Sequence, residues 1–91
     1  MRTLRYSTQY KKDIKRYANQ PEKLDALMEL LTYLQRDIPV PSEYKPHRLK
    51  GEYKGCWECH VLSDLLLIWL DEKTDIVWLE RIGSHSELFK K

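Results

Sequence analysis

Apolar positions near the start of the chain recur with the spacing of a helix. Tyr10, Ile14 and Tyr17 follow one another at intervals of four and three residues, which places them on one side of a helix. Ser7 stands where a residue that caps the start of a helix is expected. Thr3 to Tyr6 can form a short strand before it. We therefore predict a strand followed by an amphipathic helix.

A second helix follows a break at Asn19-Gln20-Pro21. Proline restricts the residue before it and suits the first turn of a new helix. Two apolar stripes joined by so short a connection predict an antiparallel helical hairpin. The apolar residues of the second stripe follow the i, i+3, i+4, i+7 pattern, and they are Leu24, Leu27, Met28, Leu31 and Leu34.

The period of the pattern changes to two from Cys56 onward, after a loop with three prolines that ends near His47. Alternation of this kind is typical of a strand. It places Trp57, Cys59 and Val61 on one face and Glu58, His60 and Leu62 on the other. The run from Leu65 to Leu70 is apolar on both faces, as expected of a central strand.

The remaining elements complete the fold class. A polar turn at Asp71 to Asp75 leads to a further strand at Ile76 to Ile82, which Gly83 ends. Ser84 can cap a final helical turn that runs through Phe89. The order is β-α-α-β-β-β with a short C-terminal helical turn, an α+β arrangement. It predicts an antiparallel sheet with the N-terminal helical hairpin packed on one face.

Length and composition favour one domain over residues 1–91. The chain has 91 residues, of which 42% are hydrophobic and 33% charged, enough for one core and too few for two. No stretch approaches the roughly 18 apolar residues of a membrane span, and no apolar signal-peptide core follows the first arginines. We expect a cytoplasmic protein that does not contact a membrane.

Charge is distributed unevenly along the chain. Residues 1–54 hold twelve Lys and Arg against seven Asp and Glu, whereas residues 55–91 hold four against seven. Such a basic half can attract a polyanion without reading its sequence, although a solvated lysine-rich face is the commoner explanation. Four basic residues line the flank of the first predicted helix, namely Lys11, Lys12, Lys15 and Arg16.

The candidate chemistry lies in the three histidines, all beside loops or strand ends. His47 follows the proline-rich loop, His60 ends a predicted strand, and His85 comes just after another. Glu58 shares a strand face with His60, and Asp64 begins the next strand across a tight turn. Because a meander of three strands can bring these groups to one edge of the sheet, they form a candidate site.

Paired imidazoles suit the cleavage of a phosphodiester bond in RNA. One group removes the proton from the ribose 2′-hydroxyl as it attacks phosphorus, and another protonates the departing 5′-oxygen. Lys54 and Arg81 can stabilise the charge that develops on the phosphate, while Glu58 or Asp64 can orient an imidazole. This chemistry needs no metal or other cofactor, and we predict none.

Plainer explanations exist for each of these residues. Single histidines are often surface residues or hydrogen-bonded structural ones. Phe89 can simply cover the end of the sheet, and Arg81 with Glu80 can be an ordinary exposed pair on a strand.

The spacing of Cys56 and Cys59 resembles that of a redox or metal motif. Along a strand, residues three apart lie roughly 10 Å apart and on opposite faces, beyond the limit of about 7 Å for a disulfide. A zinc site would need two more ligands, and although His47 and His60 are conceivable, no second paired ligand motif exists. We predict two free thiols and no metal site.

Several segments together resemble the YafQ branch of the RelE/ParE toxin superfamily. They occur in the family's order over essentially the whole chain, and they are Tyr6–Asp13, Tyr44–Leu49, Gly51–Gly55, Glu58–Val61 and Glu80–Phe89. The resemblance implies a RelE-like fold and an endoribonuclease toxin of a type II toxin–antitoxin pair. Such toxins enter the ribosomal A site and cut messenger RNA there.

The resemblance also assigns residues and partners. The family's active-site histidines match His47, His60 and His85, its acidic residue before the sheet turn matches Asp64, and its C-terminal aromatic residue matches Phe89. Glu58 stands where the best-known branch has aspartate. Partners would be a cognate antitoxin, messenger RNA and the ribosome, whose 16S RNA the basic helix would face through its phosphates. Phe89 would stack on a base, and DNA would be met only through the antitoxin complex.

Two other functions fit parts of this pattern. A ParE-type toxin poisons DNA gyrase and cleaves no RNA, and a small ribosome-associated or other RNA-binding protein would carry its histidines incidentally. The histidine set favours the nuclease, because a protein that only binds has no use for paired acid–base groups.

Overall fold

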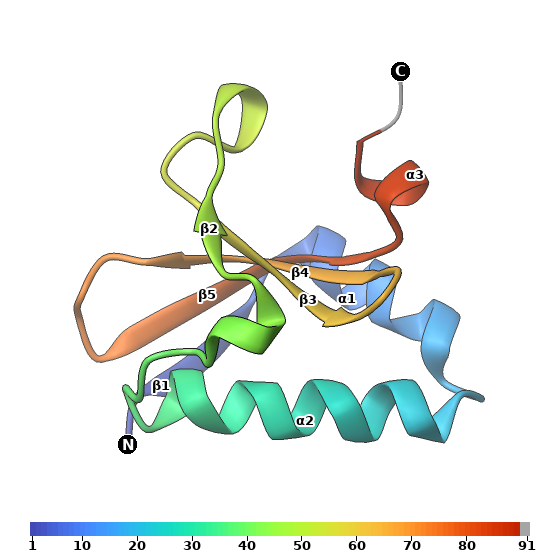
Figure 1. Cartoon of the computed structure of the whole chain (residues 1–91), viewed down its shortest axis with the longest axis horizontal. Coiled ribbons are helices and arrows are strands. Elements are labelled where there is room, and N and C mark those ends of the chain that lie inside the picture. Colours follow the sequence, from blue (N-terminus) through green and yellow to red (C-terminus); the bar gives the residue numbers. More distant parts are fainter. Residues whose placement is uncertain (90–91) are drawn as a thin grey trace.

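A five-stranded sheet in the order β1-β5-β4-β3-β2 forms the framework of the protein (Figure 1). The structure, a computed structural model, describes residues 1–89. The predicted α+β class and order of elements are confirmed, and a two-residue strand is added after the proline-rich loop. The strands are β1 (Thr3–Tyr6), β2 (His47–Arg48), β3 (Trp57–Leu62), β4 (Leu65–Asp71) and β5 (Ile76–Gly83), and the α-helices are α1 (Thr8–Ile14), α2 (Pro21–Gln35) and α3 (His85–Leu88).

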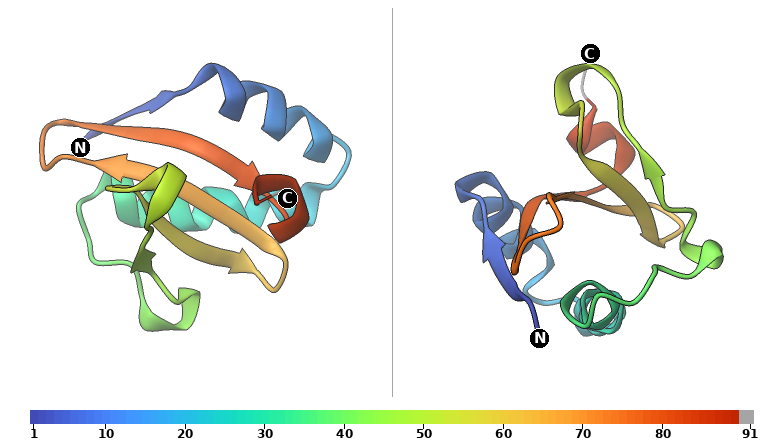
Figure 2. Two further views of the ribbon diagram at one scale, coloured as in Figure 1. Left: turned by 90° about the horizontal axis from the view of Figure 1, so that it is seen from above. Right: turned by 90° about the vertical axis from the view of Figure 1, so that its left-hand side faces the viewer.

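The two faces of the sheet have different coverings. Alternate residues of β3, among them Cys59 and Val61, join the main core with α1 and α2, so both helices pack on one face of the sheet, as predicted. On the opposite face, called the open face below, Leu66 and Ile68 form a smaller cluster with Leu88. Figure 2 shows α3 and the segment between β2 and β3 together on this side, away from α2.

The sheet is mixed, and the prediction of a wholly antiparallel sheet is wrong at β1. This strand runs parallel to β5, with Thr3 opposite Ile76 and Tyr6 opposite Leu79, whereas the other three pairs of strands are antiparallel. The reason is that no tight turn joins β1 to β5. Tight turns join β3 to β4 and β4 to β5 and make those pairs antiparallel, whereas the long chain between β1 and β5 allows either direction.

Ser7 ends β1 and begins α1, as predicted. Its backbone N–H donates to the carbonyl oxygen of Leu79 at 3.0 Å. Its Oγ donates to the carbonyl oxygen of Glu80 at 2.7 Å and accepts from the N–H of Tyr10 at 2.9 Å. β5 is irregular here, because Trp69 pairs with Leu79 and Ile68 with Arg81. Glu80 is therefore an extra residue, a bulge that marks where β1 stops and β5 continues alone.

The helices bury most of the predicted residues. Tyr10 and Tyr17 are buried, and α1 gives way to a 3₁₀ turn over Lys15–Tyr17 before Pro21 starts α2. Met28 is wrong as a core prediction, since it is 63% exposed while Leu30 is fully buried. Leu27, Leu30, Leu31 and Leu34 follow helical spacing as well as the predicted set does, and the sheet lies on their side. Among the described residues no helix is both long and apolar enough to cross a membrane.

Candidate active site

The register of the strands sets a row of side chains across the open face. His47 stands opposite Glu58, Glu58 opposite Ile68, and Ile68 opposite Arg81. In the next row His60 stands opposite Leu66, which stands opposite Gly83. His85 follows Gly83 after one residue. The topology thus places these residues on one face of the sheet, near the end where β5 stops, whereas the sequence predicted one edge of the sheet.

His47 and Glu58 form the closest pair of titratable groups in this row. Glu58 is only 3% exposed, and its Oε1 lies 3.1 Å from Nε2 of His47. Nδ1 of His47 lies 2.9 Å from the carbonyl oxygen of Lys45. Since both ring nitrogens face acceptors, an imidazolium can donate to both at once. Glu58 therefore contacts His47 rather than His60, its neighbour on the strand.

One carboxylate oxygen of Glu58 has no partner. Oε2 is buried and makes no hydrogen bond to any described residue. Leaving a buried acceptor unpaired costs about 1–3 kcal/mol. Because this oxygen is covered, a ligand could bond to it only if neighbouring side chains moved.

The short helix α3 carries His85 and is fixed at its first turn. Ser84 Oγ accepts from the N–H of Glu87, and Glu87 Oε1 accepts from the N–H of Ser84 at 2.8 Å, which completes a capping box. Asp64 Oδ1 accepts from the backbone N–H of His85 at 3.2 Å. Asp64 thus contacts the start of α3 and not an imidazole. Tyr17 ties the helix to the 3₁₀ turn after α1, since its hydroxyl donates to Glu87 Oε1 at 2.8 Å.

Phe89 lies between the site and a small core. Its ring centroid is 5.4 Å from that of His85 and 5.9 Å from that of Tyr53, which meets it edge-on. The ring also packs against the Leu66, Ile68 and Leu88 cluster. Because Phe89 is half-buried, part of the ring stays accessible beside His85.

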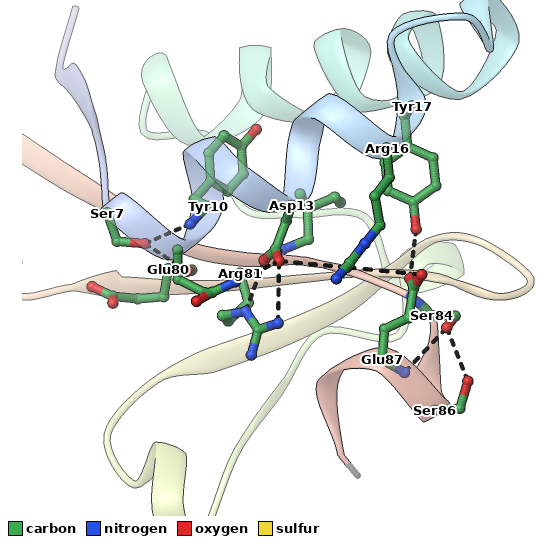
Figure 3. Close-up of polar contacts among 12 residues, drawn as sticks. Ser7, Tyr10, Asp13, Arg16, Tyr17, Glu80, Arg81, Ser84, Ser86 and Glu87 are labelled. Atoms are coloured by element: carbon green, nitrogen blue, oxygen red, sulfur yellow. Dashed lines mark hydrogen bonds and ion pairs between the residues drawn. The ribbon is translucent and has the colours of Figure 1, made fainter.

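Arg81 is not an exposed partner of Glu80, so that plainer explanation is wrong. Its Nε donates to Asp13 Oδ2 at 2.7 Å and its Nη2 to Asp13 Oδ1 at 3.1 Å (Figure 3). Its Nη1 donates to the Tyr53 hydroxyl at 3.0 Å. Hydrogen bonding to Asp13 raises the pKa of Arg81. The guanidinium therefore stays charged on the open face.

Sequence reasoning missed two residues of this site, Asp13 and Tyr53. Asp13 is fully buried, and a signal for it exists, because it falls between Tyr10 and Tyr17 at helical spacing on the buried stripe. Burial alone would raise the pKa of the Asp13 carboxyl, but hydrogen bonds from Arg81, Gln9 and the backbone N–H of Ile82 outweigh it and lower the pKa. Tyr53 carries no signal beyond its place in the segment Gly51–Gly55.

The basic residues of the first helix divide into two kinds. Lys11, Lys12 and Lys15 are exposed. Arg16 is exposed too, but its Nη1 lies 3.6 Å from Asp13 Oδ1 and 3.8 Å from Glu87 Oε2. Lys54 is exposed and follows Tyr53 in the segment between β2 and β3.

His60, Cys56 and Cys59 lie on β3 or directly before it. His60 is half-buried, and the register rather than a direct contact groups it with the other histidines. Cys56 and Cys59 are both free thiols, as predicted. Burial raises the pKa of Cys59 to about 12, so this thiol is protonated and unreactive.

The chain is similar to known proteins of one bacterial toxin family. The family model described as bacterial toxin of type II toxin-antitoxin system, YafQ, matches residues 2–90. The mRNA interferase toxin YafQ of Escherichia coli K12 is 38% identical over 90 residues, which cover 97% of this chain and 96% of the relative.

Two solved structures share the fold over nearly their whole length. The toxin in the crystal structure of the Escherichia coli DinJ-YafQ toxin–antitoxin complex is 36% identical with a TM-score of 0.84, and the match covers 97% of each chain. A metal-bound toxin from Helicobacter pylori is 38% identical with a TM-score of 0.86, and the match covers 98% of this chain and 100% of that one. The chain therefore belongs to the YafQ family of bacterial toxins of type II toxin–antitoxin systems and has their RelE-like fold.

Proposed function

We propose that this chain is an endoribonuclease toxin that cuts messenger RNA in the ribosomal A site and is neutralised by a cognate antitoxin. The observation that carries the proposal is the contact of His47 with the buried carboxylate of Glu58, on the same sheet face as His60 and Arg81. Burying a carboxylate beside an imidazole is costly and serves proton transfer better than binding. The Escherichia coli relative, named an mRNA interferase, supports the same conclusion.

The proposed chemistry is acid–base cleavage without a metal. One of His47, His60 and His85 removes the proton from the ribose 2′-hydroxyl, and another protonates the 5′-oxygen that leaves. Arg81, with the exposed Lys54 next to Tyr53, stabilises the charge on the phosphate. The products then carry a 2′,3′-cyclic phosphate or a 3′-phosphate on one side and a 5′-hydroxyl on the other.

The ribosome supplies the positioning in this proposal. The exposed lysines Lys11, Lys12 and Lys15 would contact phosphates of 16S ribosomal RNA, and Phe89 would stack on a base of the messenger. A net charge of only +2 gives the free protein little general attraction for RNA. We therefore expect little cleavage of naked RNA at physiological salt, because the substrate is not held in place.

The test is cleavage of a defined messenger on programmed ribosomes, with analysis of both RNA ends. The assay is run on toxin dialysed against EDTA, with and without added zinc or copper, because the Helicobacter relative was solved with metal bound. Cleavage by the dialysed toxin with 5′-hydroxyl ends is the expected result. Products with 5′-phosphates, or activity only after metal is added, would contradict the mechanism.

A gyrase assay separates the main rival. Inhibition of DNA supercoiling by the toxin, without cleavage on ribosomes, would favour the ParE-type function. Binding to ribosomes with neither activity would favour a protein that only binds RNA.

A further inference from the structure

We propose that Asp13 and Tyr53 are positioning residues that fix the direction in which Arg81 presents its guanidinium to the phosphate. The inference rests on the proposed function, in which Arg81 contacts the phosphate at the cleavage point. Neither residue reaches the reacting atoms in this view. Each acts on them through Arg81.

Asp13 is held in place by the strand that carries Arg81. It lies on α1 beside the stretch of β5 beyond the Glu80 bulge, where β1 no longer covers the strand. Its Oδ2 accepts from the backbone N–H of Ile82 at 3.2 Å, and its Oδ1 accepts from Gln9 Nε2 at 3.1 Å. The side chain thus bonds to a strand edge that would otherwise be unpaired, which leaves it no freedom to turn.

Arg81 is held on two sides. Of the five N–H donors of a guanidinium, Asp13 takes two along the edge formed by Nε and Nη2, and Tyr53 takes one on Nη1. The other two donors, one on Nη1 and one on Nη2, have no partner among residues 1–89 and remain for a ligand. Because the guanidinium is planar and rigid, fixing one edge fixes the direction of the remaining donors.

Asp13 fixes the direction of the Arg81 guanidinium, and it does not add positive charge to the site. A carboxylate 2.7 Å from Arg81 offsets much of the charge that would attract a phosphate. Arg16, at 3.6 Å, shares that carboxylate, and Arg16 is itself 3.8 Å from Glu87. Asp13→Asn makes the site more positive, so a purely electrostatic role predicts tighter binding and undiminished cleavage. A positioning role predicts slower cleavage in spite of the added charge.

Tyr53 connects Arg81 to Phe89, the ring proposed to stack on a base of the messenger. Its hydroxyl accepts from Arg81 while its ring meets Phe89 edge-on. The group proposed for the phosphate and the ring proposed for stacking are therefore fixed relative to each other through one residue. Tyr53→Phe removes only the hydroxyl and keeps the ring contact, so it tests the hydrogen bond without disturbing the packing.

The experiment measures single-turnover cleavage on programmed ribosomes for Asp13→Asn and Tyr53→Phe, each in the native background and with Arg81→Met. We expect Asp13→Asn to slow the first-order rate about 10–100-fold with a far smaller change in the half-saturating ribosome concentration. Tyr53→Phe should slow it several-fold. Neither should slow the Arg81→Met protein further. Equal losses in both backgrounds, or native rates in both variants, would overturn the proposal.

A matched control is the pair of Asp71 with Arg2. Arg2 Nη1 donates to Asp71 Oδ1 at 2.8 Å, and the Asp71 side chain is 8% exposed. This pair lies at the opposite end of β4 from Leu66. Asp71→Asn should lower the melting temperature and leave the cleavage rate unchanged. A slower rate in Asp13→Asn is then specific to the Asp13–Arg81 pair and not a general effect of losing an arginine–aspartate pair.

A second readout does not depend on activity. Hydrogen exchange of the Arg81 Nε–H, followed by NMR in the free toxin, should accelerate at least about tenfold in Asp13→Asn, because the bond that protects it is lost. The Arg48 guanidinium, which lies over the Trp57 ring, should be unaffected. Unchanged exchange at Arg81 would overturn the positioning role. If the native protein does not cleave RNA on ribosomes, the proposed function is overturned. The exchange measurement still tests whether Asp13 fixes the position of Arg81.

Discussion

At the scale of single residues, the three histidines occupy three different environments. His47 has an acceptor oxygen within hydrogen-bond distance of each ring nitrogen, His60 is half-buried on the open face, and His85 is exposed at the start of α3. Neither His60 nor His85 belongs to the buried core. Their side chains can therefore be removed with little loss of packing, which makes them the cleanest test of the chemistry.

We predict that His60→Ala and His85→Ala each slow cleavage about 10²–10⁴-fold, the usual contribution of a general acid or base. The measurement is single-turnover cleavage on programmed ribosomes. Thermal melts should show a folded protein in both cases. Rates near those of the native protein, or loss of activity through unfolding alone, would show that these histidines are not the acid and base.

Asp13 should make stability depend on pH in the acid range. Burial opposes ionisation of this carboxyl, but its hydrogen bonds lower the pKa below the ordinary value, so the folded state binds a proton less readily than the unfolded chain. The stabilisation is present above the ordinary carboxyl pKa and is lost as pH falls through the folded value. Asp71 and Glu87 have lowered pKa values too and contribute with the same sign.

We predict that the free energy of unfolding of the native protein falls steeply from about pH 5 to pH 2, and that Asp13→Asn makes this fall shallower. Urea titrations at a series of pH values measure both slopes. An identical dependence on pH in the two proteins would show that the pKa of Asp13 is the same in the folded and unfolded states.

The sequence identified the histidines as candidates but not the residues that hold them in place. A histidine is rare and chemically distinctive, so three beside strand ends can be noticed without a structure. Asp13 appears on an apolar stripe among many charged residues, and only its contact with β5 shows its role. Tyr53 lies in a turn whose position relative to Arg81 depends on long-range packing, which local spacing does not encode.

At the scale of elements, features that depend on residues close in sequence were predicted correctly. Ser7 and Ser84 cap helices as expected, and the alternation in β3 correctly separated the residues that face the core from those on the open face. Met28 and the direction of β1 were wrong for a shared reason. Both depend on where a distant part of the sheet lies, and neither the helical period nor the strand period contains that information.

The exposed lysines of the first helix should act in binding and not in chemistry. We predict that Lys11→Ala and Lys15→Ala each weaken ribosome binding and reduce the slope of log affinity against log salt by about 1. The rate of cleavage at saturation should stay unchanged. Lys73→Ala, an exposed lysine in the turn after β4, is the matched control and should alter neither. A slower saturated rate in the Lys11 or Lys15 variants would place the helix in the chemical step.

The cap of α3 links stability to the position of His85. We predict that Ser84→Ala costs about 1 kcal/mol, which lowers the melting temperature by about 4–8 °C in a domain of this size, and also slows cleavage. Ser84→Asp should recover most of both losses, because aspartate caps helices equally well. Calorimetry and cleavage are measured on the same preparations. Loss of stability without loss of cleavage would show that the cap stabilises the fold but does not position His85.

At the scale of the whole molecule, the uneven charge indicates how an antitoxin would bind. The excess of positive charge lies in residues 1–54, which include α1. An acidic segment that folds on this surface would cover the proposed ribosome contacts.

We predict that the protein encoded beside this chain binds it tightly, raises its melting temperature and abolishes cleavage on ribosomes. Stabilisation should grow with the logarithm of partner concentration, as for any ligand of the folded state. Titration calorimetry and the cleavage assay measure the two effects. Unchanged growth arrest when both proteins are expressed together would contradict the antitoxin partnership.

The parallel pairing of β1 with β5 determines when a newly made molecule can become harmful. Thr3 is synthesised before Ile76, so β1 stays without its partner while the intervening chain emerges. Arg81 and the turn bearing His85 follow later still. The site therefore cannot assemble until β5 and the start of α3 have left the exit tunnel of the ribosome. Synthesis and toxicity are thereby separated in time, which gives a partner made alongside the toxin an opportunity to bind first.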